Sequence, residues 1–230
     1  MQWRRNLTWR PGDLGWQIAA LFMVGSLLFA LGSFPPYSQL VDGRVVGVTF
    51  VIGSLFFTGG GYSQFLDVVN SSDDPAVGES GRFRWWVWQP ARMLWWASFV
   101  QLIGALLFNV NTIDAMAETL TVQQENRLVW GPDVFGSIAF LVASHLFWLS
   151  VCGRVWCVRR DDADWWGALL NYAGSICFMA SAITSFTLKT TGEAVSITIV
   201  NLGTFVGAIC FLVGAYVSLR PAVADAAAGG

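Results

Sequence analysis

The side chain best suited to proton transfer or ligand binding is that of His145, which lies inside a long apolar stretch. It is the only histidine in the chain, and an ionisable side chain in such a stretch is costly unless it has a partner or a use. One interpretation is a neutral imidazole that hydrogen-bonds a neighbouring helix, since Ser144 and Ser150 indicate polar surroundings. The other is transport or pH sensing, although one histidine without a nearby carboxylate makes a poor proton relay or metal site.

Side-chain amides are the second polar set in the apolar stretches. Each amide can contribute a modest hydrogen bond between helices. If several of them converge with His145 on one cavity, they would instead line a path for a small polar solute. The candidates for that path are His145, Gln101, Asn109, Asn171 and Asn201, and Gln17 and Gln64 are further amides of this set.

The four cysteines predict neither a disulfide framework nor a metal centre. Cys152 and Cys157 fall on the side that we expect to be reducing, whereas Cys177 and Cys210 lie inside apolar stretches. The spacing of Cys152 and Cys157 lacks the paired short intervals of zinc and redox sites. The chain also has no H-E-x-x-H, G-x-S-x-G or phosphate-loop motif, so we expect no enzymatic activity, no cofactor and no metal.

Six apolar stretches must position these residues, each about 20 residues long and able to cross roughly 30 Å of hydrocarbon. The chain is 55% hydrophobic and 12% charged, whereas roughly a quarter of the residues of soluble domains are charged. The first stretch is too long for a signal peptide and no A-x-A-like site follows it. We predict an all-α polytopic membrane protein with spans at Leu14–Phe34, Val45–Leu66, Met93–Asn111, Val134–Gly153, Trp165–Leu188 and Ala194–Leu219.

Basic residues indicate the orientation, because Lys and Arg accumulate on the cytoplasmic side of a membrane. With the N-terminus inside, the external connections carry three of them: Arg44, Arg127 and Lys189. The cytoplasmic segments carry the other ten: Arg4, Arg5, Arg10, Arg82, Arg84, Arg92, Arg154, Arg159, Arg160 and Arg220. Most tryptophans fall near the same face, where indole prefers the headgroup level. We therefore expect both termini in the cytoplasm, most simply at a bacterial plasma membrane.

Arginine and tryptophan alternate in the segment before the third stretch. These candidate interface residues are Arg82, Arg84, Trp85, Trp86, Trp88, Arg92, Trp95 and Trp96. One interpretation is a site for an anionic lipid formed by Arg82, Arg84 and Arg92. The other, which we favour, is an anchor that fixes depth and tilt, because aromatic belts are general. The expected partners are membrane lipids, with a protein partner or a second copy left open and no nucleic acid.

The six stretches group into three hairpins, at 14–66, 93–153 and 165–219. A cytoplasmic N-terminus (1–13), a linker (67–92), a cytoplasmic loop (154–164) and a disordered tail (220–230) complete the chain. The external loop 112–133 is polar and is the expected external contact surface. Its Ala-Met-Ala-Glu-Thr-Leu segment, 115–120, predicts a short surface helix.

A pattern of small, small, any, any, Phe recurs in all six stretches, and a compact residue follows three positions after each Phe. The first small residue and the Phe share one helix face. In lipid, such small residues let helices approach closely. The pattern predicts a two-helix hairpin copied three times in parallel orientation. The pairs are Gly25 and Phe29, Gly53 and Phe57, Gly104 and Phe108, Ala143 and Phe147, Gly174 and Phe178, and Gly207 and Phe211.

The first two stretches, LFMVGSLLFALGS and TFVIGSLFFTGGGY, resemble the YrhK-like domain, a two-helix membrane module with F-x-x-G-S-x-x-F in each helix. The last two stretches resemble it more loosely. The middle two depart furthest, with Ala105 in place of serine and His145 after Ala143-Ser144. The resemblance implies a membrane hairpin fold and carries no catalytic residue.

These patterns predict a structural or accessory membrane protein that engages lipid or a partner. The alternative is a small-solute transporter or channel with a polar path around His145. A lipid enzyme would instead require at least two ionisable or nucleophilic groups that meet at one depth.

Overall fold

The computed structural model describes residues 9–71 and 83–219, and helices are the only extended regular elements in these ranges. Six helices are long and apolar enough to cross a membrane, which confirms the predicted fold class. They are α1 (Leu14–Ser33), α3 (Gly43–Val69), α5 (Met93–Asp114), α7 (Gly131–Cys152), α8 (Ala163–Thr184) and α9 (Ile197–Val217). Three short elements join them: α2 (Pro35–Leu40), α6 (Val122–Glu125) and the π-helical turn η2 (Asn126–Trp130).

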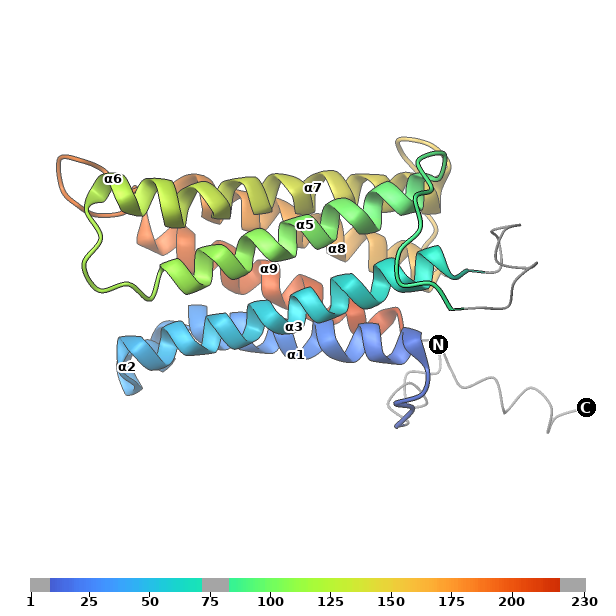
Figure 1. Ribbon diagram of the computed structural model, residues 1–230, viewed down its shortest axis with the longest axis horizontal. Coiled ribbons are helices and arrows are strands. Elements are labelled where there is room, and N and C mark those ends of the chain that lie inside the picture. The colour runs from blue at the N-terminus through green and yellow to red at the C-terminus, as the bar shows by residue number, and fades with distance from the viewer. Residues whose placement is uncertain (1–8, 72–82, 220–230) are drawn as a thin grey trace, which may run out of the picture.

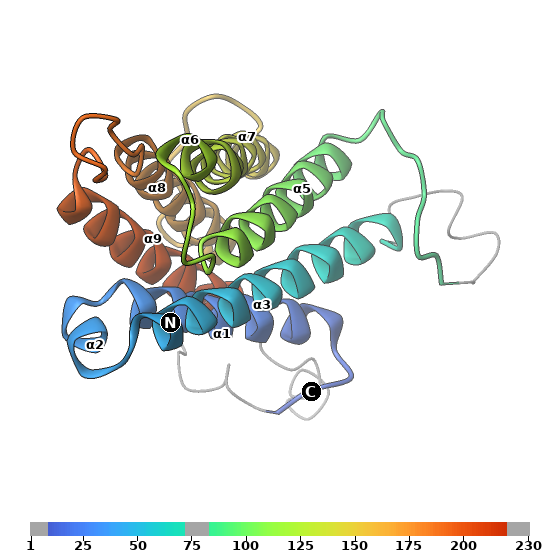
Figure 2. The ribbon, with the colours of Figure 1, turned by 60° about the vertical axis from the view of Figure 1, so that its left-hand side comes forward.

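The spanning helices follow one another around a closed ring (Figures 1 and 2). Helices α1 and α3, α5 and α7, and α8 and α9 make the most extensive contacts, so each consecutive pair is an antiparallel hairpin. Helix α3 also packs on α5, α7 on α8, and α9 on α1. The last of these contacts closes the ring.

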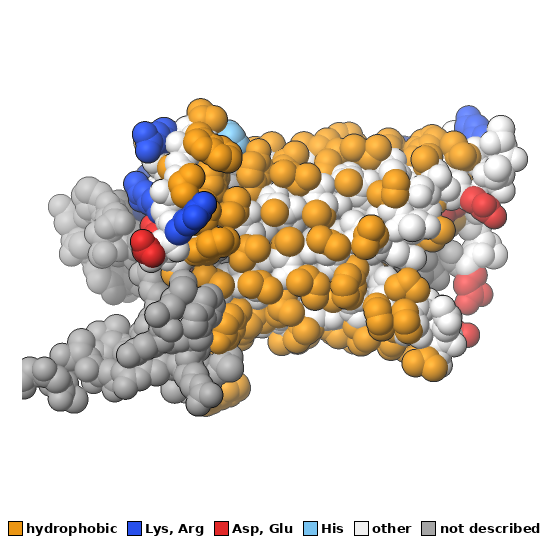
Figure 3. All heavy atoms as spheres, turned by 180° about the vertical axis from the view of Figure 1, so that it is seen from behind, with side chains coloured by type: hydrophobic (Ala, Val, Ile, Leu, Met, Phe, Trp, Pro, Cys, Tyr) orange, Lys and Arg blue, Asp and Glu red, His pale blue; other side chains and the backbone are white. Residues whose placement is uncertain are grey.

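The two ends of the ring differ in charge (Figure 3). The tryptophan-rich end is where α1, α5 and α8 begin, and the acidic end is the opposite one. Figure 3 shows an apolar middle band with most of the visible Lys and Arg at one end and Asp and Glu at the other. Side chains such as Leu27, Leu55 and Ile176 are more than half exposed along that band. An apolar surface between charged ends suits a lipid bilayer, so the chain is an integral membrane protein.

Local capping explains where several helices begin. The Asp13 carboxylate accepts a hydrogen bond from the Trp16 backbone N–H, and Asp162 accepts one from Asp164. The predicted surface helix at 115–120 is wrong, because these residues form turns. The helix begins at Val122 instead, where Thr121 and Gln124 form a capping box.

The turn between α8 and α9 shortens both predicted spans. The backbone N–H of Leu188 donates to Glu193, and Thr187 and Ala194 form an isolated β-bridge. Gly192 adopts a φ of 71°, which suits glycine. These hydrogen bonds replace helical ones, so α8 ends at Thr184 and α9 begins at Ile197.

The expectation of four unbridged cysteines is wrong, because Cys152 and Cys157 form a disulfide. Helix α7 ends at Cys152, and the φ of 66° at Gly153 turns the chain back on itself. The turn brings the two Cα atoms to 5.6 Å, a normal separation for a disulfide. Cys177 and Cys210 are free, as expected.

Some predictions fall outside the described residues. They concern the arginines and tryptophan before Trp9, most of the linker including Arg82, and the tail from Arg220 onward.

Candidate functional site

Glycines hold the two helices of each hairpin in backbone contact. A Cβ atom placed on Gly25 would lie 3.0 Å from the carbonyl oxygen of Gly53. The same test gives 3.0 Å from Gly104 to the Gly136 oxygen, and 3.0 Å from Gly174 to the Gly207 oxygen. Only glycine permits this approach, and in each hairpin a phenylalanine ring packs directly beside the paired glycines.

Two phenylalanines of each hairpin flank its glycine pair, and these six rings meet at the centre of the helix ring and close its axis. Phe29, Phe108 and Phe178 form one triangle, with ring centroids 5.9 to 6.5 Å apart. Phe57, Phe140 and Phe211 form a second triangle, with centroids 5.9 to 6.2 Å apart. Within each hairpin the two rings lie 5.1 to 5.3 Å apart, so the triangles are stacked. We name these six residues the phenylalanine plug.

The plug corrects the sequence prediction in α7. The pair predicted there was Ala143 and Phe147, but Gly136 and Phe140 occupy the contact with α5. Phe147 is half-buried and outside the central cluster. Both matches to the pattern lie on one face of α7, about two helical turns apart. The other five predicted pairs lie at the hairpin contacts and in the plug.

The predicted polar path is not assembled. Gln101 donates to Gln64 across α5 and α3 at 3.1 Å, and Asn109 donates to Thr58 across the same interface at 2.8 Å. Asn171 of α8 instead accepts from Ser144 of α7 at 3.1 Å. Asn201 of α9 has no hydrogen bond within the described part of the chain. The bonded amides thus divide between the α3–α5 and α7–α8 interfaces, and the plug fills the centre of the ring.

His145 lies in a shallow depression between α7 and α8. Its ring centroid is 5.8 Å from that of Tyr172, and Leu141, Val142 and Leu146 complete the depression. Its Nδ1 atom is buried without a hydrogen-bond partner among the described residues. His145 therefore packs against an aromatic ring and does not join helices by the expected hydrogen bond.

The Arg/Trp segment before α5 is partly internal. Arg92 donates to the Val68 carbonyl at 2.9 Å and to the Ser71 hydroxyl at 2.8 Å, which fixes the end of α3. Trp95 is completely buried and donates to the Val87 carbonyl at 2.7 Å. Neither side chain is oriented as a lipid ligand requires. In contrast, Trp85, Trp86 and Trp88 are 55 to 67% exposed.

The segments before α5 and α8 have the same construction. Trp95 and Trp96 donate to carbonyls eight and six residues earlier, at Val87 and Pro90. Trp165 and Trp166 donate to carbonyls at the same separations, at Cys157 and Arg160. The sequence shows the tryptophan pairs but not their bonds, because the acceptors are backbone atoms.

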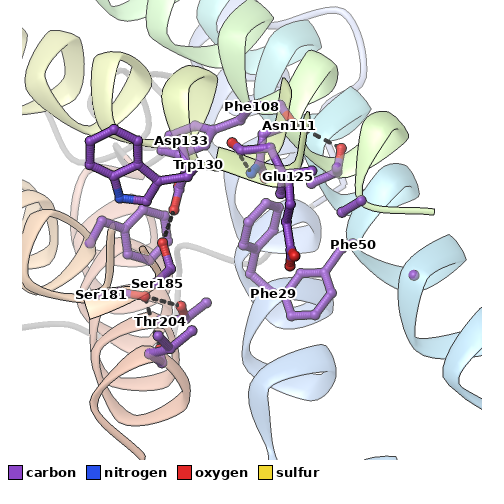
Figure 4. A pocket seen from close by; sticks show the side chains of 16 residues that line it. Phe29, Phe50, Phe108, Asn111, Glu125, Trp130, Asp133, Ser181, Ser185 and Thr204 are labelled. Carbon is purple, nitrogen blue, oxygen red and sulfur yellow. Dashed lines mark hydrogen bonds between the residues drawn. The ribbon is translucent and has the colours of Figure 1, made fainter. Parts of the chain in front are cut away.

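A cavity of about 230 Å³ lies on the axis at the acidic end, and residues of all three hairpins line it (Figure 4). The triangle of Phe29, Phe108 and Phe178 is its floor, and Phe50 adds a fourth ring. Among the described residues, Glu125 and Asp133 are the acidic side chains of its lining, and no basic side chain lines it. The Asp133 carboxylate accepts a hydrogen bond from Ser185 at 3.1 Å. Sequence reasoning named loop 112–133 as a contact surface but missed this cavity.

A π-helical turn places the acidic side chains over the cavity. Glu125 precedes η2 and Asp133 follows it in α7. Pro132, in the first turn of α7, has no backbone N–H to donate to the preceding turn, and the Gly131 N–H bonds five residues back, to Asn126. Asn126 then fixes the turn to hairpin 3, because its amide donates to the Thr187 carbonyl at 2.7 Å and accepts from the Thr187 N–H at 2.8 Å.

The fold and these contacts define a six-helix integral membrane protein. Among the described residues, no three or more His, Cys, Asp or Glu side chains gather as metal ligands. No protein-family model, curated protein or solved structure matches the chain.

Proposed function

We propose that this protein is a structural or accessory component of the membrane, and that it does not conduct solutes. The observation that carries the proposal is the phenylalanine plug, which fills the axis where a pore would run. Apolar constrictions of this kind exclude water and ions. The amides that could have lined a path bond between neighbouring helices, and the depression that holds His145 is lined by none of them.

The proposed orientation has the tryptophan-rich end in the cytoplasm of a bacterial plasma membrane. The basic residues at that end support it, because cytoplasmic connections retain Lys and Arg. In this orientation the belt of exposed Trp9, Trp85, Trp86, Trp88 and Trp156 meets the inner leaflet. Arg154 and Arg160 are exposed beside Trp156 and would meet anionic headgroups.

We further propose that the three hairpins are copies of one YrhK-like unit. The corrected position of the pattern in α7 supports this, because Gly136-Ser137-x-x-Phe140 matches the signature seen in α1 and α3. The matching tryptophan hydrogen bonds before α5 and α8 support it as well. The paired glycines of this signature contact each other within each hairpin, so they are not available to pack against a second copy.

A flux assay tests the proposal. Wild-type protein in proteoliposomes should leave the permeability to protons, alkali cations, amino acids and sugars at the level of empty vesicles. A Phe57→Ala, Phe140→Ala double variant removes two rings of the plug and serves as a matched control for leakage. Flux by the wild type that is lost in a folded His145→Ala variant would establish transport and refute the accessory role.

A further inference from the structure

The cavity at the acidic end has a composition that the accessory role does not explain. Four phenylalanine rings and Trp130 form much of its lining, and the two ionisable side chains described there are both acidic. Figure 4 shows Glu125 extending toward the rings of Phe29 and Phe50. Within the described residues the Glu125 carboxylate has no hydrogen bond or ion pair. An unpaired carboxylate above aromatic rings is a complementary surface for a positive charge.

We propose that this cavity binds a small organic ammonium ion with an apolar body. The ammonium group would pair with Glu125 and lie close to Asp133, whose carboxylate already accepts from Ser185. The apolar body would lie on Phe29, Phe108 and Phe178, whose ring faces attract cations and whose surface favours burial. Within the part of the chain that the structure describes, no Lys or Arg lines the cavity to neutralise the acidic groups.

Other ligand classes suit the cavity less well. A neutral molecule that displaced water from Glu125 would leave a desolvated charge without a partner. Calcium takes six to eight oxygen ligands from all sides, but the phenylalanine floor offers none. The hydroxyls of Ser181, Ser185 and Thr204 in the lining already take part in hydrogen bonds. The volume of about 230 Å³ lies below the ~300–1,000 Å³ of sites for drug-sized ligands. The ligand is therefore a small amine in its protonated form.

Isothermal titration calorimetry on the full chain in detergent tests this inference. The probes are phenethylammonium, its neutral counterpart phenethyl alcohol and the anion phenylacetate. We expect phenethylammonium to bind at least tenfold more tightly than the other two probes. Glu125→Gln should weaken ammonium binding about tenfold, and it removes no contact seen in the fold. Glu118→Gln, an exposed acidic residue outside the cavity, should leave binding unchanged.

The source of the ammonium group is distinguished by a fourth probe, glycerophosphoethanolamine, which represents a phospholipid headgroup. Its phosphate would be repelled by the two carboxylates, so we expect it to bind more weakly than phenethylammonium. Glycerophosphoethanolamine binding that is as tight and as sensitive to Glu125→Gln would support the ammonium site and assign it to lipid. Equal affinity for the alcohol, unchanged affinity of Glu125→Gln, or no heat with any probe on monodisperse protein would each overturn the inference. Solute flux is a separate readout, so either proposal can fail alone.

Discussion

At the scale of single residues, the bundle depends on glycines that allow helix backbones to touch. Each hairpin has a glycine pair of this kind that is flanked by plug phenylalanines. In lipid this close packing replaces the hydrophobic effect as the force between helices. Adding one methyl group at these positions should therefore lower the stability of the folded protein clearly.

The Gly104→Ala variant tests this dependence. The new Cβ would lie 2.6 Å from the Phe140 ring and 3.0 Å from the Gly136 carbonyl oxygen. Overpacking of this kind costs about 1–3 kcal/mol, so the thermal unfolding midpoint in detergent should fall clearly. The control is Gly43→Ala at the start of α3, where nothing lies within 4 Å. A Gly104→Ala midpoint equal to that of Gly43→Ala would contradict the packing account.

Sequence reasoning located most of these contacts but not all. The pattern of small residues and phenylalanine placed five of the six pairs, because a fixed spacing on a helix fixes the face. In α7 the pattern occurs twice on one face, at Gly136 and at Ala143, and face alone does not determine depth. Depth depends on which backbone position opposes Gly104, and only the packed hairpin supplies that information.

At the scale of elements, connecting segments fix the helices through side chains that bond to backbone atoms. Asn70 bonds both the N–H and the carbonyl of Arg84, at 2.7 and 2.8 Å, and so ties the end of α3 to the linker. Asn126 clamps Thr187 in the same way at the acidic end. These clamps could not be predicted, because their partners are peptide groups that any sequence supplies. The helices themselves could be predicted from length and hydropathy.

Removing the Asn126 clamp should loosen the turn between α8 and α9. Asn126→Ala deletes two hydrogen bonds and leaves the Thr187 peptide unpaired, at a cost of about 1–3 kcal/mol. Hydrogen exchange of residues 185–196 should therefore accelerate, with little change at the tryptophan-rich end. Gln123→Ala, an exposed amide on α6, is the matched control. Exchange that stays as slow as in the control would show that the clamp does not hold the turn.

At the scale of the whole molecule, the ring has one basic, aromatic end and one acidic end that contains the cavity. The guanidinium groups of Arg154 and Arg160 have no partner among the described residues, so they are available to lipid headgroups. Phosphatidylglycerol should raise the thermal midpoint more than phosphatidylcholine does. An Arg154→Gln, Arg160→Gln double variant should lose much of that gain, since each basic residue contributes about 1 kcal/mol near an anionic surface. Arg44→Gln, at the acidic end, should retain the rise in midpoint that phosphatidylglycerol gives. An equal loss of that rise in both variants would exclude a specific role for the basic end.

The disulfide adds a condition to the proposed orientation. Cys152 and Cys157 lie at the basic end, which we place in the reducing cytoplasm, where disulfides are rare. We therefore expect both thiols to be reduced in cells and to oxidise on isolation, since their Cα atoms are already 5.6 Å apart. Trapping with an alkylating reagent before lysis, followed by mass spectrometry, would detect both modified thiols. A bridge present in intact cells would favour the reverse orientation.

Labelling of single cysteines in intact cells tests the central claim most directly. In a variant without native cysteines, one cysteine is introduced at Glu118, Thr191 or Asp161, each exposed in a connection between helices. Six crossings with the basic end inside predict that a membrane-impermeant maleimide labels positions 118 and 191 at once, and position 161 only after permeabilisation. Immediate labelling of position 161, with 118 and 191 protected, would contradict the orientation, and equal labelling of all three would contradict the six-crossing membrane fold.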